Sequence, residues 1–127
     1  MAAMEVVALY AGVNIFIILV LSIRIVSVRA SRKISLGTGG DPEMEVRVRS
    51  QANATEYVPA GILGLLLLAL LNAPVWLLHA LGGSFTLGRL IHPLGMAGPI
   101  IGRQLGTIFT WTALAGFVGA LFWYALT

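Results

Sequence analysis

Four apolar stretches follow one another along the chain, separated by short segments rich in Gly, Pro and polar residues. Crossing about 30 Å of hydrocarbon takes roughly 20 consecutive apolar residues in an α-helix. The pattern therefore predicts helices over about residues 6–28, 42–71, 74–96 and 104–126, which together account for nearly the whole chain.

The connections carry recognisable helix signals. Asp41-Pro42 combines an N-cap residue with a proline suited to the first helical position, and Asn72-Ala73-Pro74 repeats that signature. We expect a hairpin between the second and third helices. Gly82, Gly83 and Pro93 weaken the third helix, and the segment 95–102 is expected to form the last connection.

Composition supports the same interpretation, since 58% of the 127 residues are hydrophobic and only 10% are charged. A water-soluble domain of this composition would lack a surface fit for solvent, so we predict one all-α membrane domain over residues 1–127. There is no cysteine, and two scattered histidines predict no metal site. The cations are too dispersed to predict a nucleic-acid partner.

All Lys and Arg residues flank the first or third connection: Arg24, Arg29, Arg32, Lys33, Arg47, Arg49, Arg89 and Arg103. Positively charged loops stay in the cytoplasm, so both chain ends are predicted to lie outside it. We expect a multi-pass protein of a bacterial plasma membrane, in contact with membrane lipids.

Polar residues also occur inside the predicted spans. Glu45, Arg49, Asn53 and Glu56 fall on one face of the second helix, and we expect this stripe to point inward. Arg89 and His92 share a face of the third helix, and Arg103 opens the fourth. Such a ring of guanidiniums around a carboxylate suits a small anion with a free amine. Headgroup anchoring, or a Glu56–Arg49 ion pair, is the simpler alternative.

The strongest local signal is Arg-x-x-x-Asn-x-x-Glu-Tyr-x-Pro over residues 49–59. This motif, the acidic loop before it, Gly-Arg-Leu-Ile-His over residues 88–92 and Arg103 resemble the MAPEG family, the membrane-associated proteins in eicosanoid and glutathione metabolism. The resemblance implies a four-helix subunit, assembly as a homotrimer, and glutathione bound between subunits.

The resemblance also implies roles for individual residues. Glutathione would be contacted by Arg49, Asn53, Glu56 and Tyr57, with Arg29 or Arg32 and Arg89 completing a carboxylate clamp. Arg103 would stabilise the glutathione thiolate. His92 stands where some relatives have a tyrosine of the glutathione site.

These features favour a membrane-bound glutathione S-transferase or peroxidase acting on lipophilic electrophiles. Gln51 and Ala52 depart from a prostaglandin-forming branch of the family, which argues against that isomerase activity. A noncatalytic lipid-binding protein of the same fold is the main alternative. A small multidrug transporter is disfavoured, because the first helix lacks the membrane glutamate usual in those proteins.

Overall fold

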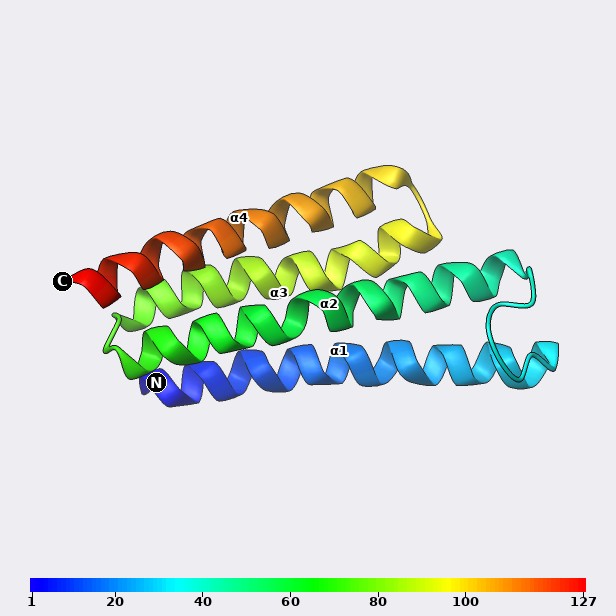
Figure 1. Ribbon diagram of the computed structural model, residues 1–127, viewed down its shortest axis with the longest axis horizontal. Coiled ribbons are helices and arrows are strands. Elements are labelled where there is room, and N and C mark those ends of the chain that lie inside the picture. The colour runs from blue at the N-terminus through cyan, green and yellow to red at the C-terminus, as the bar shows by residue number, and fades with distance from the viewer.

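The computed structural model describes all residues, 1–127, and contains helices and no strands. The helices are α1 (Ala3–Arg32), α2 (Pro42–Leu70), α3 (Val75–Ala97) and α4 (Ile100–Leu126). They run up and down in turn, so both termini lie at one end of the bundle (Figure 1). The prediction of an all-helical architecture is confirmed.

The first connection behaves as its sequence indicates. The Asp41 carboxylate accepts a hydrogen bond from the Met44 backbone N–H at 3.0 Å, and Pro42 occupies the first turn of α2. This cap satisfies one of the free N–H groups at the start of the helix. From there α2 continues without interruption past Pro59 to Leu70, about 44 Å at 1.5 Å per residue.

The turn between α2 and α3 differs from the prediction. Asn72 does not cap α3, because it adopts a left-handed conformation with φ 59° directly after α2. Asn tolerates this conformation better than most residues, so here it helps to end α2. Pro74, with φ −65° and ψ 145°, occupies the N-cap position of α3 instead.

The connection between α3 and α4 is also shorter than predicted. α4 begins at Ile100, so only Gly98 and Pro99 separate it from α3. Gly95 and Gly102, expected in the loop, are helical and face each other across the turn. A Cβ atom on Gly95 would overlap the backbone of Arg103, so only glycine permits this approach of the two helices.

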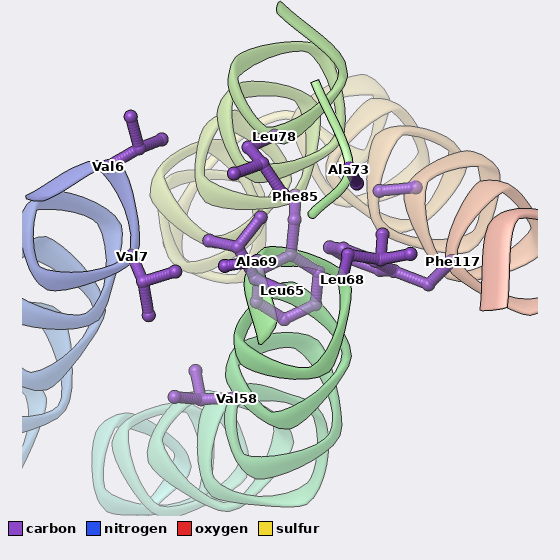
Figure 2. Close-up of a cluster of buried hydrophobic side chains, with 11 residues drawn as sticks. Val6, Val7, Val58, Leu65, Leu68, Ala69, Ala73, Leu78, Phe85 and Phe117 are labelled. Carbon is purple, nitrogen blue, oxygen red and sulfur yellow. The ribbon is translucent and has the colours of Figure 1, made fainter. Parts of the chain in front are cut away.

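The centre of the bundle is formed by α2 and α3, each of which contacts the three other helices. α1 and α4 lie on opposite flanks (Figure 2). The largest apolar cluster includes Val6 and Leu65, with the Phe85 and Phe117 rings meeting edge to face at 6.5 Å between centroids. This core fills the half of the bundle near the termini.

Three helices are long and apolar enough to cross a membrane: α1, α2 and α4, whose most apolar stretches have mean hydropathies of 2.6, 1.4 and 1.6. Only 28%, 39% and 22% of those stretches are buried, so their apolar side chains largely face outward. α3 lies among the others and carries the buried Arg89 and His92. The outward apolar surface requires lipid or another protein surface to cover it.

Candidate functional site

Three helices contribute side chains to one polar pocket of about 370 Å³, in the half of the bundle away from the termini. α2 supplies one residue per turn, and α4 does the same. The lining residues are Arg49, Asn53 and Tyr57 from α2, His92 and Met96 from α3, and Arg103, Thr107 and Trp111 from α4. Since residues four apart share a helix face, each helix presents a single stripe to the pocket.

Two guanidiniums line this pocket without a carboxylate partner in the subunit. The ion pairs of the structure involve only Arg32, Arg47, Asp41 and Glu43, near the first connection. Arg49 and Arg103 are exposed and take part in none of them. Arg103 also borders a shallow hollow on the outer face of α4. The unpaired cations make the pocket suited to an anion.

Arg89 lies behind the pocket wall and does not line it. Its side chain is only 2% exposed, and its Nη1 donates to the Asn53 side-chain oxygen at 2.6 Å. Nε and Nη2 donate to the Thr110 hydroxyl at 3.0 and 2.6 Å. The guanidinium carbon lies 4.9 Å from the centroid of the Tyr57 ring, within cation–π range. Arg89 thus connects α3 to both α2 and α4.

Close packing of α3 on α4 makes these contacts possible. A Cβ atom on Gly88 would lie 2.5 Å from the Thr110 hydroxyl, and one on Gly106 would lie 2.7 Å from three atoms of His92. His92 is 5% exposed, and its Nδ1 atom is buried without a hydrogen-bond partner. The glycines therefore allow α3 and α4 to pack closely beside the pocket.

The other predicted site residues lie outside the pocket. Arg29 donates to the Gly37 carbonyl at 2.9 Å, and Arg32 pairs with Asp41 and Glu43 at 2.9 and 3.0 Å. Glu56 is exposed and has no ion-pair partner, so it does not pair with Arg49 within the subunit.

The prediction that the polar stripe of Glu45, Arg49, Asn53 and Glu56 points inward is wrong for Glu45 and Glu56 in a single subunit, whereas Arg49 and Asn53 line the pocket. Glu45, Arg49 and Glu56 are exposed, as are the apolar residues that continue the stripe, including Leu63. Helical periodicity shows which residues share a face but not what that face contacts. The apolar continuation of the stripe, including Leu63, lines an apolar groove of about 370 Å³ between α2 and α4.

Two residues that contribute to the site were not identified from the sequence. Trp111 donates from its indole Nε1 to the Tyr57 hydroxyl at 3.1 Å. Thr110 is fully buried and accepts from Arg89. The spacing Arg103, Thr107, Trp111 was the available signal for Trp111. Thr110, an uncharged residue within an apolar run, gave none.

A second polar cluster joins α1 to α3 near the other end of the bundle. The Tyr10 hydroxyl lies 3.0 Å from His79 Nδ1, and Asn14 Nδ2 donates to Thr86 at 2.8 Å. These contacts pair the Asn14 amide nitrogen and the Tyr10 hydroxyl between two apolar helices, while Asn14 Oδ1 is buried without a partner. His79 is therefore a helix-packing residue, separate from the pocket.

Comparisons with known proteins cover almost the entire chain. The sequence profile of the MAPEG family matches residues 7–123. The chain is 32% identical over 118 residues to the inner membrane protein YecN of Escherichia coli strain K12, covering 92% of this chain and 90% of that protein. The YecN protein of Escherichia coli O6:H1 matches with the same identity and coverage.

Proposed function

This chain belongs to the MAPEG family, and we propose that it is a membrane-bound glutathione transferase or peroxidase acting on lipophilic electrophiles. The observation that carries the proposal is the pair of unpaired guanidiniums, Arg49 and Arg103, in a pocket lined by further polar side chains. Glutathione offers two carboxylates and a thiol that ionises, which are the groups such a pocket binds.

Glutathione also carries an ammonium group, for which the exposed Glu56 is the matching partner. Glu56 follows Asn53 by one turn on the same face of α2 and lacks a cation within the subunit. On insertion scales, an unpaired charged side chain at the centre of a membrane helix costs about 2.5 to 3.5 kcal/mol. Pairing with the ligand amine would relieve that cost.

Assembly as a homotrimer is part of the proposal. Arg29 and Arg32 lie at the end of α1, outside the pocket of their own subunit. A site shared between subunits would let either residue from a neighbouring copy complete the carboxylate clamp. The exposed Glu45 and Glu56 on α2, together with the apolar groove between α2 and α4, favour a protein neighbour over lipid alone.

The proposed reaction is attack by the glutathione thiolate. Arg103 would favour the charged form of the sulfur and lower the thiol pKa, which increases the nucleophile at neutral pH. In the transferase reaction, sulfur forms a bond to carbon while the leaving group departs with its electron pair. In the peroxidase reaction, the hydroperoxide becomes an alcohol and water, while two glutathione molecules become the disulfide. Electrophiles dissolved in the bilayer would reach the sulfur from the membrane.

Calorimetric titration of the detergent-solubilised protein with glutathione tests the proposal, followed by turnover with an aryl halide and a lipid hydroperoxide. Binding with turnover supports it. Binding without turnover favours the noncatalytic alternative, for which the apolar groove between α2 and α4 is the specific observation. Absence of binding rejects the glutathione site.

The proposed topology places the cationic end of the bundle in the cytoplasm of a bacterium and both termini outside it. The native chain contains no cysteine, so one cysteine introduced at Ser35 or at Thr127 is a clean probe. In intact cells, a membrane-impermeant maleimide should label the variant at Thr127 and not the one at Ser35. The reverse result contradicts this orientation.

A further inference from the structure

The hydrogen bond from Arg89 fixes the orientation of the Asn53 amide. Arginine has no acceptor atom, so the Asn53 atom that faces Arg89 Nη1 at 2.6 Å must be its oxygen. The amide nitrogen therefore points away from Arg89. Asn53 lines the pocket, and this orientation leaves its N–H groups free to donate to a ligand.

Trp111 acts on Tyr57 in the same way. The indole N–H can only donate, so the Tyr57 oxygen accepts at 3.1 Å and the phenol keeps its own proton to donate elsewhere. Tyr57 also lines the pocket. Both uncharged α2 groups of the wall therefore have a free N–H or O–H donor, as do the neighbouring guanidiniums.

Thr110 holds Arg89 in the position that produces this arrangement. Its hydroxyl donates to the Gly106 carbonyl at 2.8 Å, which leaves its two lone pairs to accept from Arg89 Nε and Nη2 at 3.0 and 2.6 Å. Every hydrogen-bonding position of the Thr110 hydroxyl is thereby used. With two nitrogens held by Thr110, the third nitrogen is directed at Asn53.

The environment of Arg89 adds an electrostatic effect. The side chain is 2% exposed and has no carboxylate partner in the subunit. A carboxylate beside it would neutralise its charge, whereas the Asn53 amide, Thr110 and the Tyr57 ring are uncharged and leave that charge without a counter-ion next to the pocket wall.

We propose that Arg89 and Thr110 are positioning residues that leave hydrogen-bond donors of the α2 wall free for the pocket, which favours an acceptor group such as a carboxylate, carbonyl or thiolate. Neither residue needs to contact the ligand. This proposal rests on the proposed function only for the identity of the ligand as glutathione. It assigns Arg89 a role through Asn53, in place of the direct contact expected from the sequence.

The experiment compares Thr110→Val with Thr110→Ser, using calorimetric titration with glutathione. Valine matches threonine in shape but cannot accept from Arg89, whereas serine can. We expect Thr110→Val to weaken binding roughly tenfold, the effect of losing a hydrogen bond to a charged group, and Thr110→Ser to stay within about twofold of wild type. Equal affinity of the valine variant and wild type would overturn the proposal. A wild type that does not bind glutathione rejects the proposed function instead.

Asn53→Asp provides a second test if the valine variant does not fold. The aspartate can still accept from Arg89, and it supplies the missing counter-charge, but it presents an acceptor to the pocket. We expect a thermal unfolding midpoint at or above that of wild type, together with a loss of glutathione affinity of at least about tenfold. A purely structural role would move affinity and stability together. Unchanged affinity, or affinity and stability that fall together, contradicts the proposed donor role of the α2 wall.

Discussion

Adding a methyl group at Gly106 tests whether the pocket depends on the close approach of α3 and α4. The new Cβ atom would lie 2.7 Å from the Cα, Cβ and N atoms of His92. Carbon atoms in normal contact are about 3.5 to 4.0 Å apart, so the helices must separate by roughly 0.8 Å or more. Two of the crowded atoms belong to the backbone, so a side-chain rotation cannot relieve the overlap.

The consequences of Gly106→Ala follow from the hydrogen bonds that join α3 to α4 near this residue. The Arg89 hydrogen bonds to Thr110, at 3.0 and 2.6 Å, join the same two helices and would lengthen with the separation. Inserting a methyl group into a packed interface typically costs about 1 to 3 kcal/mol of unfolding free energy. A shift of about 1 Å at a ligand site can also cost up to 100-fold in activity. We expect both stability and glutathione affinity to fall.

Gly119→Ala is the matched control, because it makes the same change in the same helix at a position with no other atom within 4 Å of the new Cβ. Alanine there should be neutral or stabilising by up to about 1 kcal/mol, since it favours helix more than glycine does. Unfolding in detergent and calorimetric titration measure the two effects. If Gly106→Ala were as stable as Gly119→Ala and bound glutathione equally well, the close packing would not support the site.

Three further predictions concern the charges and the assembly. Arg103→Ala should lower turnover far more than glutathione affinity. It should also raise the pKa of the bound thiol, so that activity partly recovers in alkaline buffer. Arg49→Ala should chiefly lower glutathione affinity. Thiolate absorbance across pH measures the first effect, and an unchanged titration refutes it. Glu56→Gln should weaken glutathione binding by about 2 to 4 kcal/mol. Glu43→Gln should weaken it much less, because Glu43 already pairs with Arg32 and Arg47. Equal losses of affinity in the two variants contradict a specific role of Glu56. Native mass spectrometry should detect trimers, whereas a monomer that binds glutathione removes the case for a shared site.

The helical architecture could be predicted because membrane insertion imposes a strong length and composition requirement on each span. The Asp41-Pro42 cap placed the start of α2 correctly for the same kind of local reason. The start of α4 was placed four residues late, because a Gly-rich segment resembles a loop. Gly95 and Gly102 are instead helical residues in contact with each other, and local sequence does not show which segment a glycine will approach.

Part of the membership of the pocket could be predicted from the sequence, but the contacts among its residues could not. Arg49, Asn53, Tyr57, His92 and Arg103 do line one pocket, and the resemblance to the MAPEG family, which the comparisons confirm, pointed to all five. The sequence could not show which of these residues line the pocket and which are buried behind its wall or exposed outside it. The burial of Arg89 depends on helix packing, and the exposure of Glu56 depends on the rotation of α2.

These placements together predict a link between ligand binding and assembly. One subunit holds the polar pocket, while its Glu56, Arg29 and Arg32 lie outside that pocket. If glutathione uses residues from two subunits, it binds the trimer more tightly than the monomer, and by mass action it must then stabilise the trimer. If monomers cannot bind glutathione, then glutathione at 100 times its Kd should make the free energy of trimer formation more favourable by about 2.7 kcal/mol for each binding site. Dilution into detergent, followed by cross-linking with and without glutathione, measures the shift. A trimer whose dissociation does not respond to saturating glutathione would place the whole binding site within one subunit.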